Sequence, residues 1–541
     1  MQPADGSSRA ALGLLIVALL IVVTAWWWIG AAVIVPSSQS GPQKLDCISY
    51  APFRGSQTPL DPDIRVTPTQ IEEDLRRLAP ITGCIRTYSI SNGLDQIPPV
   101  AGRLGLKVIQ GLWLSSNRAR NRTEIDGAIG LANRYPQVIS ALVVGNEVLL
   151  RGELSAGDLA KTMHEVKAAV PVPITYADVW EFWLRNRDLA AAADFITVHI
   201  LPYWEDDPVA ARAAGDHVEA IRKRVATAFP GREVLIGEVG WPSQGRMRQG
   251  ALPSPSSQAY VIADVVARAA RQGYRVNVIE AFDQPWKRAL EGTVGGYWGL
   301  FDGYSRTAKF VLGQPVSDHP YWPWQALGGA IFVIGIFAAA RWGGGGAPNA
   351  VPSLLWLVVA VIAASGGIFA GWAIERCVIE SFGIAGAARG AALAFLAVAV
   401  PPVASIALTR GETLPSFAQM LGTREERPAT LTGFAIGALL ILLTLVATEV
   451  TLGLVFDPRY RDFPFAAFTA ATAPFLLLRL VAPREEGSFG AAEIVGSALL
   501  VLGASFIVFN EGIANWQALW LAGTLLALAL TLVLARDAQG S

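Results

Sequence analysis

The chain has few of the residues that build metal centres and disulfide frameworks. It holds three cysteines and four histidines among 541 residues, and the histidines show no metal-ligand spacing, so no metal is expected. No Gly-x-Gly-x-x-Gly fingerprint follows the first expected strand, and no phosphate loop or Gly-x-Ser-x-Gly elbow stands out. We therefore expect no cofactor and no serine nucleophile. The net charge of −1 gives no reason to expect a nucleic-acid partner.

Lysine is missing from the C-terminal part of the chain, where the last lysine is Lys309. From about residue 324 to residue 536 the sequence is rich in Ala, Leu, Val, Ile, Phe and Gly, and charges are confined to short breaks. Residues 11–35 form another apolar run, whose Trp26-Trp27-Trp28 cluster suits a membrane interface and predicts an uncleaved anchor, followed by a short flexible stalk at 36–42. Seven later apolar segments have the length of membrane-spanning helices: 324–341, 351–374, 386–408, 430–455, 464–482, 489–509 and 514–535.

The arginines predict an orientation for these helices. Eight helices place both chain ends on one side of a bilayer. If the N-terminus is inside, the inner loops carry more arginine than the outer loops, as the positive-inside rule requires. The sequence thus predicts an anchor and stalk over 1–41, a globular domain outside the cytoplasm over 42–320, and a multi-pass transmembrane domain over 321–541.

Strand-like and helix-like segments alternate through the globular domain. Its helices have clear starts: Thr67-Pro68-Thr69-Gln70 combines a cap, a first-turn proline and a capping-box glutamine, and Ser155 caps a second helix. Eight strand–helix units in about 275 residues predict a (β/α)8 barrel, with a doubly wound open sheet as the competing α/β fold. The candidate strands are 47–52, 83–88, 107–112, 141–146, 173–178, 194–200, 233–238 and 275–282.

Two of the cysteines, Cys47 and Cys84, occupy similar places in the first two candidate strands. In an oxidising compartment they can pair as a disulfide. They serve equally well as two small buried apolar side chains. The sequence leaves both possibilities open.

Two glutamates stand at the ends of buried strands. Glu147 follows Ala141-Leu-Val-Val144, and Glu238 follows Val234-Leu-Ile236. Active sites of such barrels are assembled at the carboxyl ends of the strands, so these side chains can face one another across the barrel mouth. Glycosidases cleave a glycosidic linkage with a pair of carboxyl groups that flank the bond. The pair therefore predicts glycosidase chemistry.

Other polar and aromatic residues collect at nearly every expected strand end, which favours a binding site over a core or a solvated surface. Sugars present apolar faces and hydroxyl rims, so their sites combine flat aromatic rings with carboxylates, amides and guanidinium groups. Among these residues, Arg86 is placed to hold Glu238 ionised, and Asn146 to bond a sugar hydroxyl. The candidate substrate-binding residues are Tyr50, Arg86, Tyr88, Trp113, Asn146, Asp178, Trp180, Tyr203, Trp204, Trp241, Glu280, Asp283, Trp286 and Lys287.

Four motifs follow one another along the globular domain: Val144-Gly-Asn-Glu147-Val148, Gly237-Glu-Val-Gly-Trp241-Pro-Ser243, Phe282-Asp-Gln-Pro-Trp-Lys287 and Trp298-Gly-Leu-Phe301. In this order they resemble glycoside hydrolase family 17, the β-1,3-glucan-active (β/α)8 enzymes, and the match covers about residues 45–315. The resemblance implies a retaining mechanism with Glu147 as acid/base and Glu238 as nucleophile. The sequence departs from the plant members at Leu201 and Gln284, where those enzymes usually have Tyr and Glu, so plant subsite preferences do not transfer.

A domain of this kind fused to several membrane helices resembles bacterial proteins that make or remodel β-glucans, some of them transglycosylases. The implied protein is a β-glucan hydrolase or transglycosylase of the bacterial inner membrane, with its catalytic domain in the periplasm. Its expected partners are β-glucan, the lipid bilayer and, as a candidate, a membrane glucan synthase or exporter. The alternative is a non-catalytic glucan-binding or export component. The intact glutamate pair favours an enzyme, because a binding module does not need both carboxylates.

Overall fold

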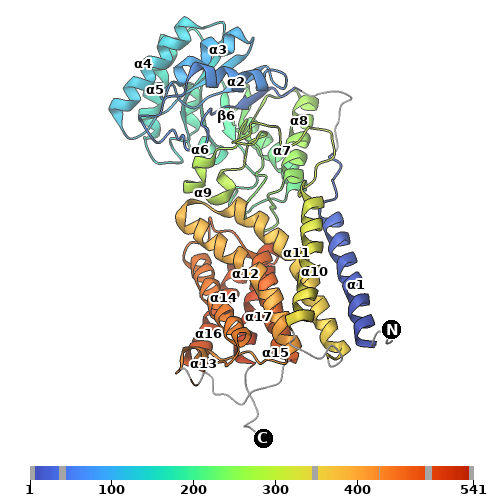
Figure 1. Cartoon of the computed structure of the whole chain (residues 1–541). Coiled ribbons are helices and arrows are strands. Elements are labelled where there is room, and N and C mark those ends of the chain that lie inside the picture. Colours follow the sequence, from blue (N-terminus) through green and yellow to red (C-terminus); the bar gives the residue numbers. More distant parts are fainter. Residues whose placement is uncertain are drawn as a thin grey trace. The chain divides into compact units, whose positions relative to one another are not determined.

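The computed structural model describes residues 6–35, 44–343, 351–423, 425, 427–481 and 490–534. The chain forms two compact units, Ala32–Val316 and the combination of Met1–Ala31 with Ser317–Ser541. The first unit is an α/β barrel and the second is a bundle of helices (Figure 1). The expected stalk at 36–42 lies outside the described residues, and the domain boundaries expected from the sequence stay predictions.

Eight parallel strands close the barrel in chain order, which confirms the predicted fold and rules out the open sheet. The ring closes where β8 pairs with β1, with Cys47 opposite Asn277. Closure leaves no sheet edge exposed. The strands are β1 (Cys47–Ser49), β2 (Cys84–Arg86), β3 (Lys107–Leu112), β4 (Ile139–Asn146), β5 (Ile174–Val179), β6 (Ile196–His199), β7 (Val234–Val239) and β8 (Val276–Val278).

Helices cover the outside of the barrel (Figure 1). The first begins as expected, since the Thr67 hydroxyl accepts from the Gln70 backbone N–H at 3.2 Å and Pro68 lies in the first turn. Instead of closing a capping box, the Gln70 side-chain amide donates to the Pro52 carbonyl at 2.7 Å, which ties this helix to the loop after β1. The helices are α2 (Pro68–Leu78), α3 (Ile97–Arg103), α4 (Arg118–Arg134), α5 (Ala156–Ala169), α6 (Trp180–Arg185), α7 (Ala211–Ala228), α8 (Pro255–Gln272) and α9 (Arg288–Gly295).

A disulfide joins neighbouring strands of the barrel. Cys47 in β1 and Cys84 in β2 are bonded, with their Cα atoms 4.4 Å apart. Both pack with small and medium side chains of other strands, among them Ala141, Ala177 and Leu235. The structure thus contains the pairing that the sequence left open.

The second unit is built from helices. Each of the eight apolar segments expected from the sequence contains a helix, and seven of the described helices are long and apolar enough to cross a membrane. The exception, α15, has 17 residues. The helices are α1 (Gly6–Ile29), α10 (Trp322–Gly343), α11 (Ser353–Glu380), α12 (Gly383–Arg410), α13 (Phe417–Leu421), α14 (Leu431–Phe456), α15 (Phe465–Val481), α16 (Ala491–Glu511) and α17 (Trp516–Val533).

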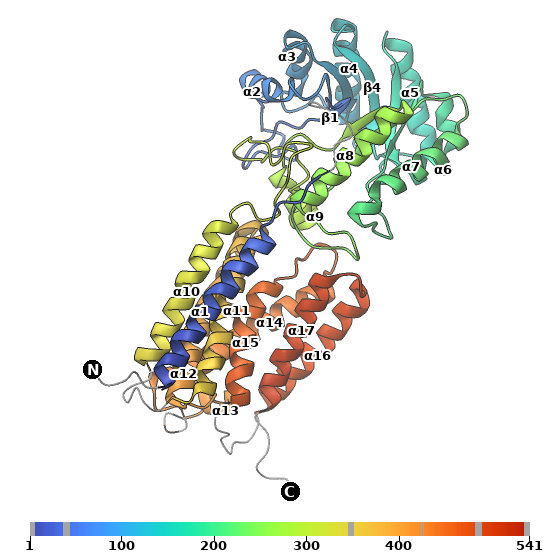
Figure 2. The same ribbon diagram turned by 90° about the vertical axis from the view of Figure 1, so that its right-hand side faces the viewer.

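The first helix is packed into this bundle. Figure 2 shows α1 alongside α10 and α11. Trp26 is fully buried, and its indole Nε1 donates to the Gly367 carbonyl of α11 at 3.4 Å. A Cβ atom added to Gly329 of α10 would lie 2.9 Å from a methyl group of Val22. Glycine on α10 and α11 therefore lets α1 approach closely, as is common between membrane helices.

Candidate active site

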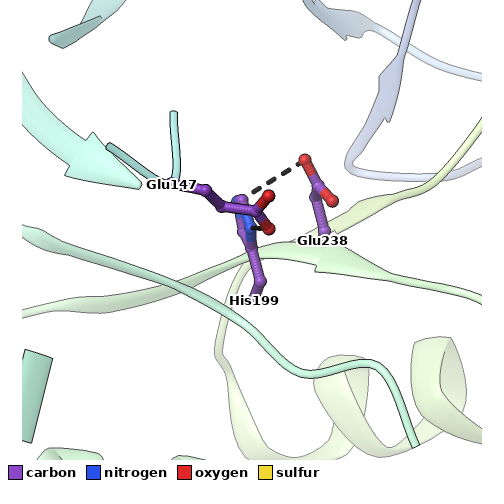
Figure 3. Close-up of side chains that lie close together, drawn as sticks. All are labelled: Glu147, His199 and Glu238. Atoms are coloured by element: carbon purple, nitrogen blue, oxygen red, sulfur yellow. Dashed lines mark hydrogen bonds and ion pairs between the residues drawn. The ribbon is translucent and has the colours of Figure 1, made fainter. Parts of the chain in front are cut away.

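Two glutamates face one another at the carboxyl ends of the strands (Figure 3). Glu147 follows β4 and Glu238 lies in β7. One oxygen of each carboxylate and one nitrogen of His199 all lie within 4.8 Å of one another. Glu147 has a positive φ of 51° and Gly145 a φ of 87°. This left-handed turn, which favours glycine, directs the Glu147 carboxylate towards Glu238.

The Glu238 carboxylate is buried and held by two donors. Arg86 donates from Nη1 to Oε1 at 2.7 Å, and the Tyr88 hydroxyl donates to the same oxygen at 2.9 Å. Burial raises the pKa of Glu238, but the nearby positive charge and the hydrogen bond from Arg86 outweigh burial and hold its pKa below the ordinary value. Glu238 is therefore ionised at neutral pH.

Arg86 is itself buried and connects several groups of the site. Its Nη1 also donates to the Gly237 carbonyl at 3.0 Å, and its Nη2 donates to Asn146 Oδ1 at 2.5 Å. Nη2 lies 3.3 Å from His199 Nε2. Because Asn146 Oδ1 accepts from Arg86, its amide nitrogen is the atom that can meet a sugar hydroxyl, which stays a prediction.

Glu147 has a more open environment than Glu238. Its side chain is 23% exposed, against 6% for that of Glu238. Its Oε1 lies 2.7 Å from His199 Nδ1. An accessible carboxyl group can exchange a proton with a substrate, whereas a shielded carboxylate next to a guanidinium group is suited to attack a carbon centre.

A second buried ion pair lies beside Glu238. Lys287 Nζ contacts the two carboxylate oxygens of Glu280 at 3.0 and 3.1 Å. Burial raises the pKa of Glu280 to about 7 despite Lys287. Asp283, by contrast, anchors a loop, because its Oδ1 accepts from the Gly299 N–H at 2.8 Å and from Lys309 at 2.9 Å. Burial raises the pKa of Asp283 to about 6.

Several of the predicted sugar-binding side chains are enclosed by protein. Trp241 and Tyr203 have no exposed surface, and their polar atoms donate to backbone carbonyls at 3.0 and 2.8 Å. The Tyr50 hydroxyl donates to Asp74 at 3.1 Å, and Trp180 is 9% exposed beneath Arg224. Asp178 is also buried and accepts from Tyr176 and from the Val179 N–H. In this conformation none of these aromatic rings offers a face to a sugar, so we do not retain them as stacking residues.

Other aromatic residues from the sequence prediction are partly exposed. Trp113 after β3 is 38% exposed, and the Arg151 guanidinium lies 4.1 Å from the centre of its ring. Trp204 and Trp286 are half-buried. Trp286 donates from Nε1 to Gln284 Oε1 at 2.9 Å, which fixes its ring. These three remain candidates for stacking on sugar rings.

Sequence reasoning missed three residues that complete the site. His199 ends β6 and lies between the glutamates. Ser49 Oγ lies 2.9 Å from the Tyr88 hydroxyl and accepts from Asn277 at 2.7 Å. The only sequence signal for His199 was its place at the end of an expected strand, which a core histidine would share, and Ser49 and Asn277 had none that sets them apart from core polar residues.

The glutamate–histidine group is also the one set of described residues whose types and spacing would suit a metal ion. Its electrostatics argue against that use. Glu238 Oε1 already accepts from Arg86 and Tyr88. A cation at this oxygen would stand next to the buried Arg86 guanidinium, and like charges repel strongly where water is excluded. The absence of a metal stays a prediction.

Known proteins resemble the barrel. The model of the BtgE/BtgC glycoside hydrolase domain matches residues 47–299. A glucan 1,3-beta-glucosidase of Candida albicans is 27% identical over 267 residues, which cover 44% of this chain and 85% of that protein. A probable beta-glucosidase btgE of Aspergillus fumigatus is 29% identical over 228 residues, and the chain spans 40% of its length. The solved glycoside hydrolase family 17 beta-1,3-glucanosyltransferase of Rhizomucor miehei is 25% identical with a TM-score of 0.44, covering 50% of this chain and 97% of that one. Residues 47–299 are thus similar to a glycoside hydrolase domain, and the relatives include glucan-active enzymes.

Proposed function

We propose that the protein is a membrane-bound retaining glycosidase or transglycosylase that acts on β-1,3-glucan outside the cytoplasm. One observation carries the proposal: an accessible carboxyl group, Glu147, and a buried carboxylate, Glu238, have oxygens within 4.8 Å of one another. Retaining glycosidases hold their carboxyl groups about 5–5.5 Å apart, whereas inverting enzymes leave about 6.5–9.5 Å for a water molecule. The short separation favours double displacement.

The residues suggest how the two steps divide. In the first step Glu238 attacks the anomeric carbon while Glu147 protonates the departing oxygen. Arg86 and Tyr88 keep Glu238 ionised and aimed, so the nucleophile needs little reorganisation. Once Glu238 is glycosylated it loses its negative charge. Glu147 then ionises more easily and can take a proton from the incoming water or sugar hydroxyl.

The substrate class is supported by the relatives. The Candida albicans protein, which the chain matches over 85% of its length, is named a glucan 1,3-beta-glucosidase. The exposed Trp113 and the half-buried Trp204 and Trp286 supply stacking surface suited to several glucose units. More stacking surface than one sugar needs favours an acceptor subsite, and hence transfer to a second glucan over hydrolysis.

The cellular setting is part of the same proposal. Seven helices with the length and composition of membrane spans support a multi-pass membrane protein, and we place it in the bacterial inner membrane as part of this proposal. The arginine distribution favours a periplasmic barrel. A membrane glucan synthase or exporter would then be a natural neighbour, since it would supply glucan chains at high local concentration.

The test is a pair of variants in the full-length protein, Glu147→Gln and Glu238→Gln. Both should lose most activity on β-1,3-gluco-oligosaccharides. An aryl β-glucoside with a good leaving group needs less acid assistance, so it should restore the glycosylation burst to Glu147→Gln but not to Glu238→Gln. Glu233→Gln, which changes a half-exposed surface glutamate paired with Arg275, is the matched control and should behave as wild type. Equal rescue of both variants would contradict the assignment of Glu147 as acid/base and Glu238 as nucleophile. An inactive wild type would favour a glucan-binding component.

A further inference from the structure

His199 is the residue that connects the two glutamates. It is the last residue of β6 and has no exposed side-chain surface. Its Nδ1 lies 2.7 Å from Glu147 Oε1 and its Nε2 lies 3.5 Å from Glu238 Oε1 (Figure 3). An imidazole between an acid/base and a nucleophile can favour one protonation state of either, so its own protonation decides what it does.

The surroundings determine which nitrogen carries the proton. Arg86 Nη2 lies 3.3 Å from His199 Nε2, and a guanidinium group has donors but no acceptor. Nε2 must therefore present its lone pair to Arg86. A cationic imidazole would turn an N–H towards Arg86 and add a second positive charge in a buried site. The neutral ring with its proton on Nδ1 satisfies both contacts, because Nδ1 then donates to Glu147.

Neighbouring elements hold the ring in this position. A Cβ atom added to Gly237 of β7 would lie 2.4 Å from Thr197 Cγ2 and 3.3 Å from His199 Cδ2. Glycine at 237 thus makes room for β6 and the imidazole. The ionisable groups around the ring are Glu147 from β4, Arg86 from β2, Glu238 from β7 and, through space, Asp178 from β5.

We propose, on the basis of the function proposed above, that His199 is a positioning residue that holds Oε1 of Glu147 and so assigns the proton exchange with glucan to Oε2. In the first step the proton on Oε2 moves to the glycosidic oxygen as the bond from that oxygen to the anomeric carbon breaks and the bond to Glu238 forms. In the second step Oε2 takes the proton of the acceptor hydroxyl as the acceptor oxygen bonds to the anomeric carbon and Glu238 is released.

Two substitutions separate the two contacts of the ring. Asparagine can place an amide N–H near the position of Nδ1, so His199→Asn keeps the bond to Glu147. Glutamine can place a carbonyl oxygen near the position of Nε2, so His199→Gln keeps the bond from Arg86 and loses the one to Glu147. The kcat/KM of His199→Gln on β-1,3-gluco-oligosaccharides should fall roughly 10- to 100-fold. This is the loss of rate expected when one hydrogen bond to a charged group is removed. The alkaline limb of its pH profile should move to higher pH, because the Glu147 carboxylate loses the donor that contacts its Oε1.

His199→Asn should retain most of the rate and the wild-type alkaline limb. The matched control is His217→Asn, because His217 also contacts a carboxylate, Glu205 at 3.0 Å, outside the catalytic machinery. If wild type is active and His199→Gln shows an unmoved alkaline limb, the positioning role is wrong while the proposed function stands. An inactive wild type overturns the proposed function and the positioning role together.

A second measurement on the full chain needs no turnover. The chain has four histidines, so ¹⁵N-histidine labelling gives few imidazole signals, and His199→Asn identifies the His199 pair by its loss. At neutral pH we expect a protonated Nδ1 and an unprotonated Nε2. An Nε2–H tautomer or a doubly protonated ring overturns the inference.

Discussion

Replacing Arg86 by methionine removes the charge that faces Glu238 while keeping an unbranched side chain of similar length. The Arg86 side chain is 1% exposed, and its Nη1 lies 2.7 Å from Glu238 Oε1. Removing one partner of a buried ion pair costs roughly 3–5 kcal/mol, because the other charge stays buried without compensation. We expect a loss of stability near 3 kcal/mol, the low end of that range, because the Tyr88 hydroxyl and Lys287 still stabilise the anion.

The pH dependence of this variant has a definite sign. In wild type the folded-state pKa of Glu238 is lowered, so the pair stabilises the fold above the unfolded pKa, and this contribution is lost as pH falls through the folded pKa. In Arg86→Met burial is less opposed, which raises the pKa of Glu238. The acidic limb of kcat/KM should therefore move to higher pH. At pH 7 we expect kcat/KM to fall about 10- to 100-fold. This is the loss of rate expected when one hydrogen bond to a charged group is removed.

The assay is a pH profile of the full-length protein with an activated aryl β-glucoside, together with thermal unfolding of the same samples. Arg275→Met is the matched control, since its pair with Glu233 is half-exposed at 50% and 51% and such pairs are worth about 0–1 kcal/mol. Arg86→Met with Glu238→Gln should be more stable than Arg86→Met alone, because the buried charge is then absent. A variant that loses rate with an unmoved acidic limb would refute the electrostatic role of Arg86.

Two further outcomes test the proposed function. A reporter that is active only in the periplasm should work when fused after Gly313 and fail when fused after Gly343, and the reverse pattern would overturn the orientation. At millimolar concentrations of β-1,3-gluco-oligosaccharides, the full-length protein should form longer or branched products, and Trp286→Ala should shift the balance towards hydrolysis. Glucose and shorter sugars alone at every concentration would leave a plain hydrolase.

The sequence predicted the barrel because its strands are short apolar runs rich in β-branched residues, separated by helices with recognisable caps. It predicted the two glutamates because Glu147 and Glu238 come shortly after the runs that end at Val144 and Ile236. It could not tell which aromatic residues face the cleft. Trp241 and Trp113 both follow strands, yet one is fully buried and the other is 38% exposed, since loop packing decides the direction of each ring.

The role of His199 was beyond sequence reasoning for a related reason. A histidine at the end of a buried strand has the same local pattern whether it fills the core or contacts a catalytic group. Its contacts join β2, β4, β6 and β7, which lie far apart in the chain. Only closure of the barrel brings these four strand ends together.

The packing of α1 has a consequence for how the protein can be made and truncated. Its partners α10 and α11 are synthesised only after the whole barrel, so the helical unit is assembled from two pieces of chain that are separated by Ala32–Val316. Until α10 and α11 are made, the Trp26 and Val22 side chains of α1 lack the helices that cover them in the folded bundle. Deleting α1 to obtain a more tractable protein would leave a glycine-lined seam on α10 and α11 without its occupant. Because α1 packs against both helices, expression designs should keep it.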